Sequence, residues 1–212
     1  MKKYFSMVRH WNKIWLSTVL GFVLLFGFCG CAAAGETSST EEAASENVVN
    51  TGGSHILVAC FSATGHTMPL AEYAADMLGA DLYEIVPEDP YTKEDLAYYT
   101  GGRCDQEQDD PDVRPAISGK VAHMEQYDTV LIGHPIWHGQ APRIISTFLE
   151  SYDFSGKTLV TFCTSESSGL GSSAQNLYDL VPDSVTWLES RRFPIGTEKE
   201  EVAAWLNEIG LL

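Results

Sequence analysis

The sequence is poor in cysteine, and its five cysteines form no pattern that indicates a metal site or a disulfide framework. None belongs to a CxxC pair, and no group of histidines and cysteines has the spacing of zinc ligands. Cys60, Cys104 and Cys163 lie beyond the N-terminal region, and their number is odd. Cys60 and Cys163 each end an apolar run, which is typical of a buried thiol that packs as a small apolar side chain. The sequence therefore predicts no metal site.

Acidic residues are absent from the first 30 residues, and basic residues are scarce in the rest. The first 30 residues contain four basic residues, whereas the remaining chain has nine basic and 29 acidic residues, a balance of −20. A surface of that sign repels nucleic acid and anionic lipid headgroups and favours a cationic partner. We therefore expect no nucleic-acid binding.

The N-terminal region combines a basic start with an apolar run over residues 14–28, followed by small residues around two cysteines. It resembles a bacterial lipoprotein signal peptide over residues 1–30, in which cleavage before Cys31 leaves an acylated cysteine. An uncleaved membrane anchor is the alternative. In both cases the basic end stays inside, so the rest of the chain is expected at the extracytoplasmic face of the cell membrane. Residues 31–54 are mostly small, polar or acidic and predict a disordered acidic tether.

Residues 55–212 alternate apolar runs with amphipathic stretches, which predicts one α/β domain. Strands are expected over residues 55–60, 80–86, 128–137, 157–164 and 184–189, and helices over residues 70–78, 117–127, 141–152, 171–181 and 198–212. Five such units favour a doubly wound, flavodoxin-like five-stranded parallel sheet with helices on both faces. Residues 87–115 are too long for an ordinary connection, and long loops of this kind are often functional.

The loop after the first strand, "FSATGHT" at residues 61–67, contains hydroxyls and a glycine but no lysine. Amide hydrogens at a helix start bind phosphate, and Ser62, Thr64 and Thr67 add hydroxyl donors. The loop matches neither the Walker pattern nor GxGxxG, so a single terminal phosphate suits it better than a triphosphate. The alternative is a turn whose hydroxyls only cap the helix.

Two further loops are expected at the same edge of the sheet, because ligands of open parallel sheets sit where the strands end. In "GHPIWHGQAPR", Trp137 lies at the predicted loop mouth, where a planar ligand can stack on it. In "CTSESSGLGSS", backbone amides are placed to bond the edge of a ring. Together the three loops predict a site for a mononucleotide with a flat ring.

The chain resembles the flavodoxin family, and in particular a branch of bacterial flavodoxin-like lipoproteins. The resemblance is carried by "FSATGHT", "ADLYEIVPEDPYT", the run from "RPAIS" to "GLGSS" and "WLESRRF". It implies FMN as cofactor and no catalytic side chain. Carried over by position, the phosphate would contact Ser62, Ala63, Thr64, Gly65, His66 and Thr67. The ring would lie along Pro135, Ile136, Trp137, His138 and Gly139, with its polar edge at Thr164, Ser165, Ser168 and Gly169.

The sequence departs from the family pattern at three places. His66 replaces the usual asparagine, His138 replaces a second aromatic residue, and Glu166 and Ser167 replace glycine-like residues. A charged His138 would stabilise the anionic reduced flavin, and Glu166 would oppose that charge. The alternative is that both are solvated loop residues.

Three functions are compatible with these residues. The favoured one is an FMN-binding redox protein that passes electrons to a redox partner protein or a small acceptor at the outer membrane face. The second is an FMN-dependent NAD(P)H or quinone reductase, in which Tyr98 or Tyr99 from "AYYTGGRCDQEQDD" belongs to a substrate lid; the alternative for that stretch is an acidic surface loop. The third is a binding module that keeps the fold without flavin.

Overall fold

The computed structural model describes residues 55–212 and, as backbone only, residues 48–49. The predicted signal peptide, Cys31 and all of the tether except residues 48–49 lie outside the described residues. In the described part, no helix combines the length and apolar character needed to cross a membrane.

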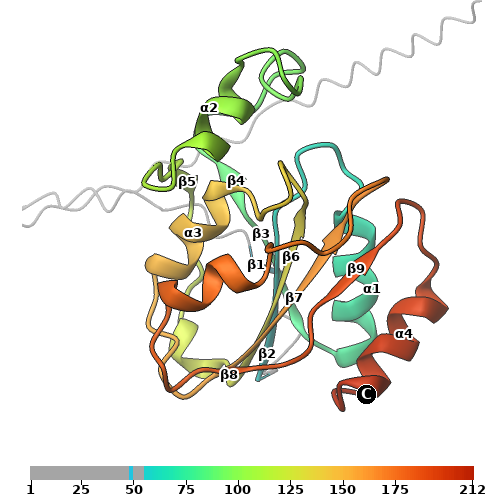
Figure 1. Ribbon diagram of the computed structural model, residues 1–212. Coiled ribbons are helices and arrows are strands. Elements are labelled where there is room, and N and C mark those ends of the chain that lie inside the picture. Colours follow the sequence, from blue (N-terminus) through green and yellow to red (C-terminus); the bar gives the residue numbers. More distant parts are fainter. Residues whose placement is uncertain (1–47, 50–54) are drawn as a thin grey trace, which may run out of the picture. The chain divides into compact units, whose positions relative to one another are not determined.

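A parallel sheet forms the centre of the domain (Figure 1). Its strands run in the order β3-β2-β6-β7, with β8 and β9 both beside β7. The bounds are β2 Ile56–Cys60, β3 Asp81–Glu84, β6 Thr129–Pro135, β7 Thr158–Thr164, β8 Thr186–Trp187 and β9 Arg191–Phe193. This order reverses direction at β2, between β3 and β6, as in doubly wound sheets. The predicted five-stranded parallel arrangement is therefore confirmed.

Helices cover both faces of the sheet (Figure 1). Helix α1, Met68–Leu78, and helix α4, Lys199–Glu208, pack with Val58, Phe162 and Trp205 on one face. Helix α3, Arg143–Glu150, and the 3₁₀ helix η2, Gln175–Leu180, cover the other face with Leu57 and Ile132. Because successive residues of a strand point to opposite faces, β2 is apolar on both sides and buries Leu57 and Val58 in different cores.

The predicted fifth strand over residues 184–189 is wrong in its bounds, because the edge strand is divided in two. Thr186 and Trp187 pair with Thr158 and Leu159, and pairing resumes with Arg191 opposite Phe162. Four residues of the edge strand therefore span the same distance as three residues of β7. This extra residue is a bulge, which edge strands commonly contain.

Two predicted helices are also corrected. Residues 117–127 contain β5, Ile117–Ser118, and the short 3₁₀ helix η1, Met124–Gln126, because Gly119 and His123 have positive φ angles of 78° and 55° that interrupt an α-helix. β5 pairs antiparallel with β4, Val86–Pro87. Residues 171–181 form only η2, since Gly171 has a φ of 58° at one end and Pro182 follows at the other.

Two segments that the sequence predicted as irregular contain regular structure. Val48–Val49 forms β1, which pairs antiparallel with β3, so the predicted disordered tether over residues 31–54 is interrupted by a two-residue strand. Valine favours extended backbone, and β3 would otherwise be the edge of the sheet. The long stretch of residues 87–115 includes helix α2, Arg103–Asp109 (Figure 1).

Candidate functional site

A cavity of about 590 Å³ lies at the carboxyl ends of β6 and β7, beside the start of α1. Its volume is in the usual range for small-molecule sites. Ten of the residues predicted for the ligand line it, namely Thr64, His66, Pro135, Ile136, Trp137, His138, Gly139, Thr164, Ser165 and Ser168. The wall also contains Leu96, Tyr98, Tyr99, Glu166, Ser167 and Ile195. The other predicted residues, Ser62, Ala63, Gly65, Thr67 and Gly169, are not part of this wall.

The first loop, residues 62–67, is held in shape by its own serine. The Ser62 hydroxyl accepts hydrogen bonds from the backbone N–H groups of Thr67 at 3.0 Å and Met68 at 3.2 Å. Gly65 has a φ of 79°, a conformation that glycine adopts without strain. Within residues 55–212, the N–H groups of Ala63, Thr64 and His66 have no protein acceptor. Such amides before a helix N-terminus fit a phosphate group.

Thr67 ties the first loop to the sheet. Its side chain is 1 % exposed, and its hydroxyl lies 2.7 Å from the hydroxyl of Thr164 at the end of β7. One hydroxyl donates and the other accepts, so the Thr67 side chain positions the loop within the protein.

The second loop, residues 135–140, contains a tight hairpin turn. Trp137 and Gln140 exchange two backbone hydrogen bonds of 2.9 Å, and His138 and Gly139 between them have φ angles of 49° and 75°. Two consecutive positive φ angles are the signature of a type I′ turn. The turn presents His138 to the cavity.

Trp137 is more deeply buried than its expected place at the loop mouth indicates. Its side chain is 4 % exposed and belongs to the core that also contains α3 residues. Its ring meets Phe61 edge-on at 5.5 Å and Tyr91 edge-on at 5.1 Å. These contacts bury most of the indole, so Trp137 anchors the turn in the core and also forms part of the cavity wall.

The third loop, residues 164–171, offers a second set of amides. Ser165 caps it by accepting the N–H of Ser168 at 2.8 Å, and within the described chain the N–H groups of Glu166, Ser167 and Gly169 have no protein acceptor. From β9, the Arg192 guanidinium donates to the carbonyl oxygens of Ser165 and Glu166. No sequence pattern singled out Arg192.

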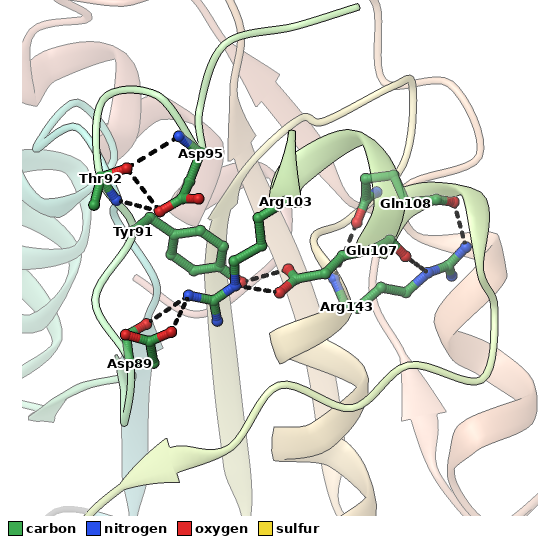
Figure 2. Close-up of polar contacts among 8 residues, drawn as sticks. All are labelled: Asp89, Tyr91, Thr92, Asp95, Arg103, Glu107, Gln108 and Arg143. Carbon is green, nitrogen blue, oxygen red and sulfur yellow. Dashed lines mark hydrogen bonds and ion pairs between the residues drawn. The ribbon is translucent and has the colours of Figure 1, made fainter. Parts of the chain in front are cut away.

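A polar network joins helix α2 to residues 89–91, at the start of its own long segment (Figure 2). Glu107, a buried residue, accepts hydrogen bonds from the Tyr91 hydroxyl at 2.6 Å and from Nε of Arg103 at 2.7 Å. The Arg103 guanidinium also lies 4.1 Å from the centre of the Tyr91 ring and bonds Asp89. Burial, together with the bond to Glu107, raises the pKa of Tyr91. Because Glu107 is buried and each of its two carboxylate oxygens accepts a hydrogen bond, this network should hold the segment more firmly than an ion pair at the surface would.

Gln108 connects the same helix to the second loop. Its side-chain NH₂ donates to the carbonyl oxygens of Trp137 at 3.1 Å and Ala141 at 3.2 Å. Arg143, the first residue of α3, donates from its guanidinium to the backbone oxygens of Glu107 and Gln108. Figure 2 shows this link between α2 and α3. Residues 87–115 are therefore bonded to the rest of the domain and contribute to the cavity wall, and they are not a separate surface loop.

Asp105 joins the segment of residues 98–101 to the second loop. Its carboxylate accepts N–H groups from Tyr99 at 3.1 Å, Thr100 at 2.7 Å and Gly101 at 2.8 Å, and Nε2 of His138 lies 2.9 Å away. Burial disfavours the charge, but the hydrogen bonds outweigh it and hold the pKa of Asp105 below its usual range. Asp105 is therefore a carboxylate at neutral pH.

His134 lies in β6 just before the second loop and is fully buried. Its Nδ1 donates to the Pro135 carbonyl at 2.9 Å, and its Nε2 has no partner among the described residues. Burial lowers the pKa of His134 to about 4, so the ring is neutral at pH 7. His134 belongs to the stretch "GHPIWHGQAPR", but no pattern there distinguishes it from the neighbouring strand residues.

The described residues contain neither a metal-ligand cluster nor an exposed thiol. Among residues 55–212, no group of three or more His, Cys, Asp or Glu side chains is placed to hold a metal. Cys60, Cys104 and Cys163 are buried free thiols, and burial raises the pKa of each. A raised pKa suppresses the reactive thiolate.

A sequence model of the flavodoxin family matches residues 55–209. A solved structure from Bacteroides eggerthii, provisionally described as a flavoprotein, is 44 % identical, covers 73 % of this chain and 96 % of its own, and superposes with a TM-score of 0.67. A similarly described protein from Bacteroides uniformis is 39 % identical with a TM-score of 0.69, over 74 % of this chain and 99 % of its own. A flavoprotein from Lactobacillus acidophilus, solved in complex with FMN, shares the fold at 20 % identity and a TM-score of 0.53, over 71 % and 97 % of the two chains. No curated protein matches the chain.

Proposed function

Because the chain belongs to the flavodoxin family and FMN is its cofactor, we propose that it is a redox protein that transfers electrons at the extracytoplasmic face of the membrane. The observation that supports this best is the cavity with unpaired backbone amides in both its first and its third loop. A phosphate and a flat polar-edged ring are the groups that such an arrangement fits.

The first loop would hold the phosphate through the amides of Ala63, Thr64 and His66, with the positive end of the α1 dipole behind them. The second and third loops would enclose the ring, and the amides of the third loop would bond its polar edge. FMN supplies reversible electron transfer when bound. The protein's own part is binding, orientation and charge, with carboxylates at Asp105 and Glu166 near the ring end.

A second candidate is an FMN-dependent reductase for a small flat acceptor such as a quinone. It is favoured by one observation, namely that Tyr98 and Tyr99 line the cavity and place their ring centres 5.4 Å from that of His138. Aromatic side chains at a cavity mouth suit a planar substrate, whereas a protein partner needs the mouth to be open.

Titration of the purified full chain with FMN tests the cofactor site. We expect the fluorescence of FMN to be quenched at micromolar concentration, with one FMN per chain at saturation. Unquenched fluorescence at that concentration would contradict the proposal.

Turnover separates the carrier from the reductase. The FMN-loaded protein is mixed with NAD(P)H and a soluble quinone, and loss of the NAD(P)H absorbance is followed. Sustained consumption of NAD(P)H favours the reductase, whereas reduction that requires a protein donor favours the carrier.

We also propose that acylation of Cys31 anchors the protein in the membrane, a role supported by the basic start and the apolar run before it. Cells that express the wild type or Cys31→Ala are labelled with palmitate. Label should appear in the wild type and not in the variant, and equal labelling would reject the assignment.

A further inference from the structure

The cavity has one wall that is attached mainly by hydrogen bonds rather than by packing. This wall is the strap, residues 98–101, which contains two tyrosines that line the cavity. Tyr98 is 46 % exposed and Tyr99 89 % exposed, so the Tyr98 side chain is only about half buried and the Tyr99 side chain buries little apolar surface against the domain. The Tyr98 hydroxyl reaches the Ile136 carbonyl only at 3.5 Å, the outer limit for a hydrogen bond.

The backbone of the strap is also unfavourable on its own. Tyr99 has a φ of 59° and Gly101 a φ of 74°, and the first of these is a conformation that a residue with a side chain seldom adopts. Such a conformation persists only where surrounding groups enforce it. In the strap, the enforcing group is Asp105, which accepts the N–H groups of Tyr99, Thr100 and Gly101.

The residues next to the strap are, by contrast, firmly held. Asp105 lies in the first turn of α2. Helix α2 is fixed to the second loop by the Gln108 side chain, and to α3 by Arg143, which donates to the backbone oxygens of Glu107 and Gln108 (Figure 2). The fourth bond of the Asp105 carboxylate runs to His138 in the second loop. One carboxylate therefore joins a fixed helix, a weakly packed strap and the turn at the ring end.

We propose that the strap is a lid over the ring end of the FMN site and that Asp105 is its latch. The proposal rests on the proposed FMN site. With the latch closed, Tyr98 and Tyr99 stay beside His138 and slow the release of FMN. When the bonds to Asp105 break, the strap leaves the cavity while α2 and its network stay in place. Asp105 is thus a positioning residue, which acts through the strap and His138.

The test compares Asp105→Asn with the wild type by two readouts. An amide in place of the carboxylate keeps the volume, but it loses the negative charge and one of the two acceptor oxygens, so either Tyr99 or the pair Thr100 and Gly101 loses its acceptor. Amide hydrogen exchange of Tyr99, Thr100 and Gly101 is measured by NMR without FMN, and the release rate of FMN is measured by its returning fluorescence. Each lost hydrogen bond to a charged acceptor should accelerate both processes by about tenfold or more.

The matched control is Asp95→Asn. Asp95 is in the same segment and also caps it, by accepting the N–H and hydroxyl of Thr92, but it bonds neither the strap nor His138. Its replacement should leave the exchange at Thr100 and Gly101 and the release of FMN at wild-type rates. Should Asp105→Asn fail to fold, as judged by circular dichroism, Gly101→Ala serves instead, because Gly101 has a φ of 74° and is not in the cavity wall, so the added carbon strains only the strap and should still accelerate FMN release.

Each combination of results decides the matter. Faster exchange and faster release in Asp105→Asn, with Asp95→Asn unchanged, support the latch and the lid. Unchanged exchange refutes the latch, and faster exchange with unchanged release refutes the lid. If the wild type binds no FMN, the proposed function fails, and the latch is then decided by the exchange rates alone.

Discussion

The two ends of the cavity are built in different ways. At the phosphate end, six consecutive residues form the first loop, and Ser62 within the loop supplies the hydrogen bonds that shape it. At the ring end, the wall comes from the strap, the second loop and the third loop, and it is held by bonds such as that between Asp105 and His138. The first end is a local structure, whereas the second exists only after the chain has folded.

This difference predicts how each end responds to substitution. A change in the first loop should affect the phosphate and leave the ring site intact. A change at the ring end should propagate, because each of its loops is supported by another. FMN and riboflavin, which lacks the phosphate, distinguish the two cases when their affinities are measured side by side.

Gly171→Ala should have the largest effect. Gly171 has a φ of 58°, and a Cβ there would lie 2.7 Å from the Gly139 carbonyl oxygen, where the third loop packs on the second. We expect a loss of roughly 2–4 kcal/mol in the free energy of unfolding, from backbone strain and the clash together. FMN and riboflavin should weaken to the same degree. Urea denaturation and the two titrations measure these effects.

Gly156→Ala is the control for Gly171→Ala. Gly156 has a φ of 74°, but nothing lies within 4 Å of the added carbon. Its loss should be limited to backbone strain, about 1–2 kcal/mol, without any change in ligand affinity. Equal losses in the two variants would show that the contact between the loops has no energetic role.

The same division explains which features could be predicted from the sequence. The alternation of strands and helices and the hydroxyl-rich loop after the first strand are local patterns, and they led to the doubly wound parallel sheet and to the loops at its carboxyl edge. Ser62 and Thr67 are only five positions apart, so the shape of their loop depends on neighbours that a reader of the sequence can see.

Contacts between distant residues could not be predicted in this way. Trp137 is buried by Phe61 and Tyr91, both far from it in the sequence, whereas its place between a proline and a glycine favoured a position at the loop mouth. The bond between Asp105 and His138 links positions 33 residues apart. Nothing in the acidic stretch distinguishes Asp105, which accepts three amides, and the buried Glu107 from the exposed Asp109 and Asp110.

His134 is a buried pH-sensitive group in β6, directly before the second loop. Its pKa falls from 6.5 to about 4 on folding, so between these values the unfolded chain binds a proton that the folded chain does not. The free energy of unfolding should therefore decrease as the pH falls through this window, by about 3 kcal/mol in total at 1.36 kcal/mol per pKa unit.

Urea denaturation at pH 4 to 7 measures this effect, with His134→Asn as the test variant. Its free energy of unfolding should vary less with pH than that of the wild type, whatever its absolute stability. His123→Asn is the control, because His123 is exposed and asparagine tolerates its positive φ of 55°. An unchanged pH slope in His134→Asn would assign the acid sensitivity to other groups.

The tie between Thr67 and Thr164 connects the two ends of the cavity. Thr67→Val leaves the buried Thr164 hydroxyl without its partner and should cost about 1–3 kcal/mol. The double variant Thr67→Val/Thr164→Val removes both hydroxyls and should recover most of that loss. A double-mutant cycle by urea denaturation yields the coupling energy. Additive losses would mean that the two hydroxyls do not act as a pair.

Ser62→Ala should have the smallest effect on stability and the most selective effect on binding. It removes the acceptor for two amides of the first loop, a loss of about 1 kcal/mol as for other helix-capping serines. FMN affinity should fall by about tenfold, since a loop that loses its shape no longer directs its free amides at one phosphate. Riboflavin affinity should stay at the wild-type value, because the ring end does not depend on Ser62.

Ser165→Ala is the corresponding change in the third loop, where the serine hydroxyl caps the amide of Ser168. It should weaken FMN and riboflavin equally, since we propose that the amides it positions bond the ring and not the phosphate. If Ser62→Ala instead weakens both ligands alike, the first loop cannot be an independent local structure. The hydrogen bond between Thr67 and Thr164 would then couple the two loops, and the cavity would respond to substitution as one cooperative unit.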